Sequence, residues 1–212
     1  MFQSLTAVPG FDLWPGLLDP ADQRALVDAV MAAADAAPFA HYGTAYGKAM
    51  SVAMTAFGPL GWTSDPSGYR YADRHPGTGA AWPAMPPALL DLWAKLGDPE
   101  TPPDSCLINL YRGDARMGLH QDRDEADPTF PVLSISLGDT AVFRIGGTSR
   151  KDPTRSLKLN SGDVCRLSGP ARLAFHGVDR ILGGSSGLVP GGGRINLTLR
   201  RARAVAQSPV ET

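Results

Sequence analysis

Short apolar runs that alternate with polar positions fill the second half of the chain, from about residue 104 onward. Gly, Asn and Asp separate these runs, as is typical between strands. The segment LNSGD (159–163) is a candidate hairpin turn between two of them. Seven or more short strands without intervening helices predict an antiparallel sandwich or jelly roll. The runs are SCLINLY, VLSISLG, AVFRIGG, RSLKLN, DVCRLS, LAFHGV and RINLTLR.

The first half contains a segment with helical spacing. Asp19 can cap a helix at its N-terminus, and Pro20 suits the first helical position. Apolar residues then recur three and four positions apart, which predicts an amphipathic helix packed on another element. These residues are Leu26, Val27, Val30, Met31 and Ala34.

A second helix is predicted after the pair Pro86-Pro87, ending at Gly97. Both helices are expected to cover one outer face of the strands, so the fold class is mostly β with flanking helices (α+β). The side predicted to be buried carries Leu89, Leu90, Trp93 and Leu96.

Composition limits the domain organisation and the class of partner. The chain has 212 residues and is 43% hydrophobic, which suits one core, so we expect a single domain over 1–212. A formal net charge of −1 excludes a protein driven onto nucleic acid by bulk positive charge. No apolar run approaches the roughly 18 residues of a membrane span, and the start lacks a signal-peptide pattern. We therefore expect a cytoplasmic protein with no membrane partner.

Two cysteines and two loop segments carry further expectations. Cys106 and Cys165 lie in apolar strand-like runs, so buried, reduced thiols are expected. The stretch 50–85 is rich in Gly, Pro and aromatic residues, and forms either an ordered functional lid or a plain surface connection. GGSSGLVPGGG (183–193) is expected to be a flexible loop.

The most charged interval, LHQDRDEAD (119–127), lies between two predicted strands. A solvated loop is the ordinary reading of such a run. In an extended segment, however, alternate side chains share a face, so His120 and Asp122 can chelate one ion. This alternation places His120, Asp122 and Asp124 on one side, and Gln121, Arg123 and Glu125 on the other.

A second histidine, His176, lies in the otherwise apolar run LAFHGV. Two imidazoles and one carboxylate form the facial triad typical of non-haem Fe(II) oxygenases, which leaves positions for co-substrate and oxygen. From these residues alone, a hydrogen-bonded core histidine and a chance His-x-Asp pair remain the alternative.

The run RINLTLR (194–200) supports the metal site. Alternation places Arg194, Asn196, Thr198 and Arg200 on one face and three aliphatic residues on the other. On an edge strand this polar face is simply solvated. In the mouth of a jelly roll its guanidinium groups offer bidentate sites for a dicarboxylate such as 2-oxoglutarate.

In their joint order, these motifs resemble the AlkB-type Fe(II)- and 2-oxoglutarate-dependent DNA/RNA dealkylases. The resemblance runs from about Met50 to Arg200, and residues 1–49, an N-terminal extension and helix, match only loosely. It implies a double-stranded β-helix (jelly-roll, cupin-like) core over 104–200 and a nucleotide-recognition lid over 50–85. The motifs are MSVAMT, GWTSDPSGYRY, WPAMP, CLINLYRGDARMGLHQDRDE, SISLGDTAVFRIGG, GDV, FHGV and RINLTLR.

The resemblance assigns roles by position. The residues similar to the iron ligands are His120, Asp122 and His176, and Arg200 joins them in the catalytic set. Those similar to the 2-oxoglutarate contacts are Asn109, Tyr111, Arg194, Asn196 and Arg200. Those similar to contacts of the flipped base and its flanking phosphates are Trp62, Tyr69, Tyr71, Asp124 and Arg150.

The resemblance also implies a reaction. Fe(II), O2 and 2-oxoglutarate would oxidise the alkyl group on a base nitrogen, releasing formaldehyde, succinate and CO2. A base would enter a slot between Trp62 and His120, with Asp124 accepting a hydrogen bond from its exocyclic amine. The implied partner is alkylated single-stranded DNA or RNA, bound by a monomer without an obligate protein partner. A modest basic set predicts weak, salt-dependent binding: Arg112, Arg116, Arg123, Arg150, Lys151 and Arg155.

Other functions stay open at this point. A 2-oxoglutarate-dependent hydroxylase or demethylase acting on a protein or small molecule would carry the same metal site. A non-catalytic β-sandwich module leaves the order of His120, Asp122, His176 and Arg194 unexplained, and a zinc hydrolase lacks a placed general base. The chain also departs from the family pattern near Leu167, where many bacterial relatives carry Trp.

Overall fold

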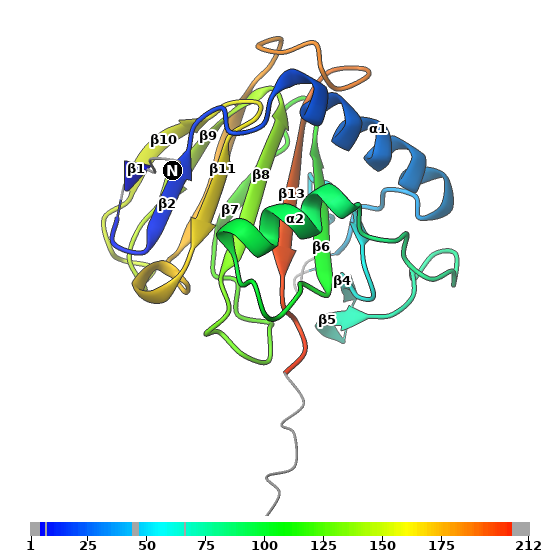
Figure 1. The fold of residues 1–212 in the computed structure, drawn as a ribbon, viewed down its shortest axis with the longest axis horizontal. Helices are drawn as coiled ribbons and strands as arrows, with labels where there is room; N and C mark the ends of the chain where they lie inside the picture. Colours follow the sequence, from blue (N-terminus) through cyan, green and yellow to red (C-terminus); the bar gives the residue numbers. More distant parts are fainter. Residues whose placement is uncertain (1–4, 7, 44–46, 66, 205–212) are drawn as a thin grey trace, which may run out of the picture.

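Two facing antiparallel sheets form the centre of the molecule, as seen in the computed structural model (Figure 1). The structure describes residues 5–6, 8–43, 47–65 and 67–204. The larger sheet has the strand order β1-β2-β11-β8-β13-β6-β3. Its strands are β1 (Leu5–Thr6), β2 (Phe11–Trp14), β11 (Val164–Leu167), β8 (Val132–Gly138), β13 (Arg194–Arg200), β6 (Ser105–Tyr111) and β3 (Ala53–Phe57).

The smaller sheet has the order β10-β9-β12-β7. Its strands are β10 (Arg155–Leu159), β9 (Thr140–Ile145), β12 (His176–Leu182) and β7 (Met117–His120). From β6 to β13 the chain crosses repeatedly between the sheets, and only β9 and β10 follow each other within one sheet. This crossing pattern is that of a jelly roll, so the predicted double-stranded β-helix core is confirmed.

Both predicted helices cover the outer face of the larger sheet (Figure 1). Helix α1 (Pro20–Ala36) begins after Asp19, whose carboxylate accepts hydrogen bonds from two backbone N–H groups of the first turn. Helix α2 is Pro87–Leu96. Apolar side chains of both helices pack on Ile195, Leu197 and Leu199 of β13, so that strand is central and not an edge.

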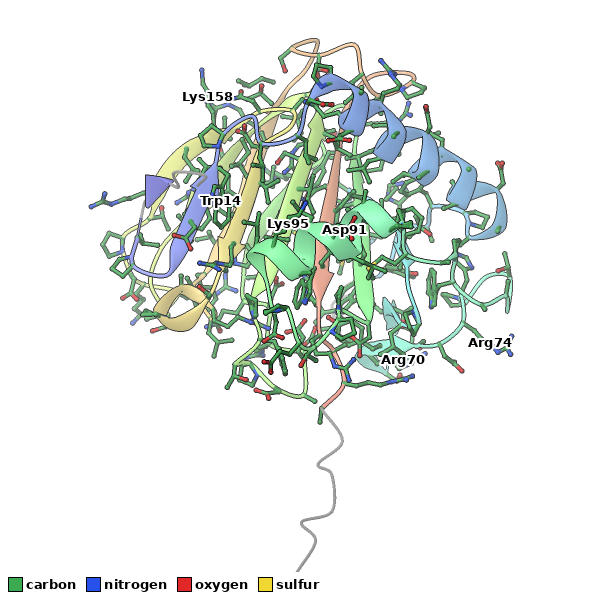
Figure 2. All side chains as sticks on the ribbon, in the orientation of Figure 1. Trp14, Arg70, Arg74, Asp91, Lys95 and Lys158 are labelled. Atoms are coloured by element: carbon green, nitrogen blue, oxygen red, sulfur yellow. The ribbon has the colours of Figure 1, made fainter. Side chains whose placement is uncertain are left out.

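One residue of α2 was assigned to the wrong side. Leu90 is exposed, and Leu92 is buried in its place. The buried positions 89, 92, 93 and 96 follow a single helical stripe, whereas Leu90 lies about 100° away from Leu89. Asp91 and Lys95 project from the solvent side of the same helix (Figure 2).

The stretch 50–85 contains strands that its irregular pattern did not predict. After β3, the chain forms the hairpin of β4 (Gly61–Asp65) and β5 (Gly68–Ala72). Within the run LAFHGV, only the last three residues belong to a strand, because β12 begins at His176 and extends to Leu182. His176 is therefore at the beginning of a strand and not inside one.

The loop 183–193 is fixed by a buried carboxylate. Asp139 accepts hydrogen bonds from the backbone N–H groups of Gly184, Ser186 and Gly193. The glycines that suggested flexibility are instead required by the backbone conformation of the loop, since Gly191, Gly192 and Gly193 all have positive φ.

The space between the sheets forms a second core. Phe143, Ile145 and Val178 of the smaller sheet pack there against Leu107 and Tyr111 of β6, among other apolar residues. Cys106 and Cys165 are buried free thiols, as predicted, on opposite faces of the larger sheet. Within the described ranges, neither helix has the length and hydropathy that crossing a membrane requires.

Candidate metal centre and its cavity

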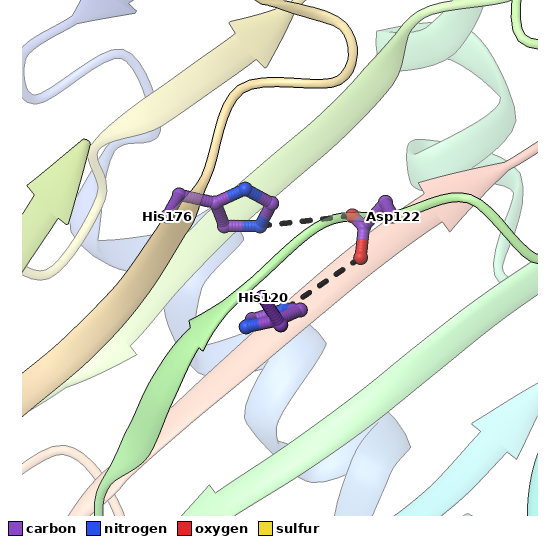
Figure 3. Close-up of side chains that lie close together, drawn as sticks. All are labelled: His120, Asp122 and His176. Atoms are coloured by element: carbon purple, nitrogen blue, oxygen red, sulfur yellow. Dashed lines mark ion pairs between the residues drawn. The ribbon is translucent and has the colours of Figure 1, made fainter. Parts of the chain in front are cut away.

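His120 and His176 lie directly opposite each other on neighbouring strands. His120 ends β7, His176 begins β12, and the antiparallel register pairs the two residues. Their ring centroids are 4.5 Å apart. Asp122 follows two residues after His120, and its carboxylate oxygens lie 3.6 Å from His120 Nε2 and 3.8 Å from His176 Nε2 (Figure 3). The three ligand atoms thus surround one point, within 4.8 Å of one another.

The backbone fixes the tautomer of both rings. His120 Nδ1 lies 2.9 Å from the carbonyl oxygen of Gly118, and His176 Nδ1 lies 3.0 Å from that of Ala174. A carbonyl can only accept, so each neutral ring carries its proton on Nδ1. The Nε2 lone pairs therefore face Asp122, as a metal site requires.

The charge of Asp122 is maintained by its neighbours. Burial opposes ionisation, but Arg200 Nη2, 2.9 Å from Oδ2, and the two histidines hold the pKa of this carboxyl well below its usual range. Arg172 Nη1 donates to the Asp122 backbone carbonyl over 2.6 Å and so orients the ligand. Burial, together with His120, lowers the pKa of His176 to about 4, which keeps its ring neutral and able to bind a metal.

Glu125 lies inside the protein, contrary to the predicted alternation. Its side chain is 2% exposed. Its Oε2 accepts a hydrogen bond from Arg172 Nη2 over 2.9 Å, and its Oε1 lies 3.3 Å from Arg200 Nε. The Tyr71 hydroxyl donates to the same carboxylate. Strand β7 ends at His120, so the alternation of an extended chain does not continue through Glu125. Glu125 and Arg172 were missed because no local pattern marks an isolated charge as buried.

The expected 2-oxoglutarate residues face one another across two strands. The register of β6 and β13 pairs Asn109 with Asn196 and Tyr111 with Arg194. The Arg194 guanidinium lies 5.4 Å over the Tyr111 ring, and its Nη2 donates to Ser136 Oγ at 2.9 Å. Asn109, Tyr111, Asn196 and Arg200 line the cavity beside the triad, whereas Arg194 lies behind Tyr111.

Unpaired buried atoms show that these residues fit a metal and an anionic co-substrate. Asp122 Oδ2 is buried and, among the described residues, has no hydrogen-bond partner of good geometry; Arg200 Nη2, 2.9 Å away, balances its charge, so a lone pair remains for a metal ion. Arg194 is 1% exposed, and its Nε and Nη1 lack hydrogen-bond partners, as does Asn109 Oδ1. Among the described residues no carboxylate forms an ion pair with Arg194, so a buried cation remains for a ligand carboxylate.

The triad opens on a cavity of about 910 Å³. On its wall, Trp62 stacks on Tyr69 with centroids 5.2 Å apart and meets Tyr42 edge-on at 6.1 Å. Trp62 Nε1 donates to Asp124 Oδ2 over 2.8 Å. The structure thus brings Trp62, Tyr69 and Asp124 together around the cavity that also holds His120.

The other expected substrate residues lie in different surroundings. Arg150 lines the cavity and covers the Phe175 ring at 4.9 Å. Tyr71 lies behind the wall, where its hydroxyl is bonded to Glu125. Tyr42 was not predicted, because it falls in the segment 1–49, where the motif match is loose. Leu167, the point of departure from the family, is buried on the cavity wall.

Comparisons with known proteins place this arrangement in a family. The family model described as "2OG-Fe(II) oxygenase superfamily" matches residues 10–200. The alpha-ketoglutarate-dependent dioxygenase AlkB homolog of Caulobacter vibrioides is 82% identical over 199 residues, covering 94% of this chain and 90% of the relative. The chain belongs to the AlkB family of 2OG-Fe(II) oxygenases.

Two more distant matches agree with this AlkB-family assignment. The DNA N(6)-methyladenine demethylase ALKBH1C of Arabidopsis thaliana is 34% identical over 173 residues, 67% of this chain and 38% of that protein. The solved structure of OsALKBH1 superposes with a TM-score of 0.78 at 30% identity, covering 94% of this chain and all of that one.

Family membership defines the enzyme class and its cofactors. This AlkB-family protein is an Fe(II)- and 2-oxoglutarate-dependent dioxygenase. His120, Asp122 and His176 are the group of described residues positioned to hold the iron. When bound, iron, 2-oxoglutarate and oxygen supply an oxidation that protein side chains alone cannot perform.

Proposed function

We propose that this AlkB-family enzyme removes alkyl groups from base nitrogens in single-stranded DNA or RNA by oxidation, with release of formaldehyde, succinate and CO2. The observation that carries the proposal is that one cavity has both a metal site and an aromatic wall. The His120–Asp122–His176 triad is on one side of it, and the stack of Trp62 on Tyr69 is on another. An aromatic wall beside a metal site suits a planar base whose alkyl carbon must be held near the reacting centre.

The residues divide the work between binding and positioning. Trp62 offers its ring for stacking, and Asp124, already fixed by the Trp62 N–H, has its other oxygen for an exocyclic amine. Arg116, Arg123 and Arg150 line the same cavity and can contact phosphates. Arg194 and Arg200 would bind the co-substrate carboxylates, and burial excludes water from them.

The names of relatives support a nucleic-acid substrate, since one is called a DNA N(6)-methyladenine demethylase. We further propose that the enzyme is a cytoplasmic monomer and that it needs no obligate protein partner. Single strands are preferred because extracting a base from a duplex costs a few kcal/mol of pairing and stacking, whereas a base in a single strand has little of either to lose.

The test compares formaldehyde release from methylated single strands and from the same lesion in a duplex, for wild type and Trp62→Ala. Loss of the stacking ring removes about 1–3 kcal/mol, so the apparent substrate constant rises severalfold or more. Substrate-free 2-oxoglutarate decarboxylation should survive, because the triad and both arginines are unchanged.

Two outcomes contradict the proposal. If both activities fall together in Trp62→Ala, the ring is structural and does not bind the base. If neither activity falls, or wild type releases no formaldehyde from any oligonucleotide, a protein or small-molecule substrate replaces nucleic acid.

A further inference from the structure

A second, smaller cavity of about 300 Å³ lies beside the main one, along β7 and β12. Its walls include Arg116, Gly118, Leu119, Arg144, Gly177 and Asp179, and we call it the side groove. Arg144 belongs to β9, where Phe143 and Ile145 on either side of it point into the core between the sheets. Arg144 therefore points to the outer face of the smaller sheet.

A glycine lies next to this arginine in the wall of the side groove. Gly177 is the register partner of Arg144 on β12, so no side chain occupies the neighbouring position. A Cβ atom at Gly177 would lie 2.6 Å from the carbonyl oxygen of Met117, which excludes larger residues. The missing side chain at Gly177 thus lets the backbone of β7 approach β12 closely, and both strands contribute backbone to the wall of the side groove.

The side groove is positively charged. Within the described part of the chain, neither Arg116 nor Arg144 forms an ion pair, and Arg144 Nη2 is oriented by donating to Thr154 Oγ1 over 2.9 Å. The carboxylate of Asp179 is 2.9 Å from Arg180 Nη1, which balances its charge. Two guanidinium groups without a carboxylate partner suit an anion with several oxygens, such as a phosphate.

The side groove is continuous with the main cavity. Arg116, Gly118, Leu119 and Gly177 line both. They meet at β7, the edge strand of the smaller sheet among the described strands, where Ser51 Oγ is hydrogen-bonded to the backbone of Arg116 just before the strand begins. An extended polymer that leaves the main cavity can continue past Arg116 towards Arg144.

We propose that the side groove binds a backbone phosphate of the nucleic-acid strand outside the main cavity, with Arg144 as its principal ligand and Arg116 at the junction. This inference rests on the proposed nucleic-acid substrate. It adds a contact on the outer face of the smaller sheet, away from the base and the metal.

The experiment measures binding of an unmodified single-stranded oligonucleotide by fluorescence anisotropy at several salt concentrations. The variant is Arg144→Gln, and the charge-matched control is Lys158→Gln, which removes an exposed cation on β10 that lines neither cavity. Loss of one phosphate contact should reduce the slope of log K against log salt by about 0.7 and weaken binding severalfold. Lys158→Gln should keep the wild-type slope, and a methylated trinucleotide too short to reach Arg144 should be turned over equally by all three proteins.

Several results would overturn the inference. Equal salt slopes in wild type and Arg144→Gln would show that Arg144 makes no phosphate contact. Equal losses of affinity in both variants would indicate an effect of general surface charge. If Arg144→Gln changed only how strongly inorganic phosphate competes with the oligonucleotide, the side groove would be a site for free anions. Failure of wild type to demethylate any oligonucleotide would instead remove the proposed function, while a slope change specific to Arg144→Gln would still support the side groove.

Discussion

At the scale of single residues, the metal centre is prepared by contacts within the chain. Both ligand histidines donate from Nδ1 to the carbonyl two residues before them, so the same local geometry occurs at the end of β7 and the start of β12. Asp122 is positioned through both its carboxylate and its backbone carbonyl, by Arg200 and Arg172. These contacts hold the three ligands in the orientation that a metal site requires.

Replacing a ligand histidine should remove turnover and leave the fold. His120 has a side chain that is 35% exposed, so His120→Ala deletes little of the core. We expect 2-oxoglutarate decarboxylation with Fe(II) to fall to background, while the metal-free thermal unfolding midpoint stays within a few degrees of wild type. Unchanged decarboxylation would show that His120 is not a ligand.

Arg194→Lys tests the anchor of the co-substrate. Lysine keeps the charge but loses the planar pair of donors, so the affinity for 2-oxoglutarate should fall on the order of tenfold. Anaerobic calorimetry with Fe(II) measures this, with the unfolding midpoint as the control for folding. Equal affinity would transfer the anchoring role to Arg200, which lines the cavity directly.

Sequence reasoning at this scale succeeded where a regular strand carries the residues and failed where it ends. The alternation of β13 placed Arg194, Asn196 and Arg200 on the inner face, because that strand runs for seven residues without a break in register. Glu125 was misplaced because the chain leaves β7 at His120 and turns its carboxylate inward to meet two arginines. Partners distant in sequence, such as Arg172, determine that turn.

At the scale of elements, the sequence predicted the strands after residue 104 better than those before it. Strands β6, β8, β9 and β13 bury one or both faces, which imposes alternation or continuous apolar runs. The hairpin of β4 and β5 is short, and β5 contains no fully buried residue, so its pattern is weak. Its place beside the cavity follows from tertiary contacts of Trp62, which no local pattern encodes.

Helix α2 offers a test of the packing. Leu92→Ala should lower the free energy of unfolding by about 2–5 kcal/mol, because it leaves a cavity against the larger sheet. Leu90→Ala removes a side chain on the exposed side of the same helix. It should change the free energy of unfolding by no more than about 0.5 kcal/mol. Urea unfolding of both variants measures the difference, and equal losses would contradict the observed helix orientation.

At the scale of the whole molecule, the sandwich isolates its two thiols from water. Burial raises the pKa of Cys106 and of Cys165 to about 12. An unfolded thiol ionises near 8.5, so between 8.5 and 12 the unfolded chain holds fewer protons than the folded one. Stability is therefore complete below about pH 8.5 and is lost as pH rises.

This linkage should appear in urea unfolding between pH 8.5 and 10, below the ordinary titration of tyrosine. The free energy of unfolding should fall by about 1.4 kcal/mol per pH unit for each thiol. Cys165→Ala removes one of the two, so its slope should be about half that of wild type. An equal slope in the variant would show that other groups cause the loss.

The same burial determines how the protein meets electrophiles. Alkylating agents attack the thiolate, and a thiol with a pKa near 12 holds on the order of one thiolate in 10⁵ molecules at pH 7. An ordinary exposed cysteine holds a few per cent under the same conditions. Because both thiols are buried and largely protonated at pH 7, Cys106 and Cys165 should react with alkylating agents far more slowly than exposed cysteines.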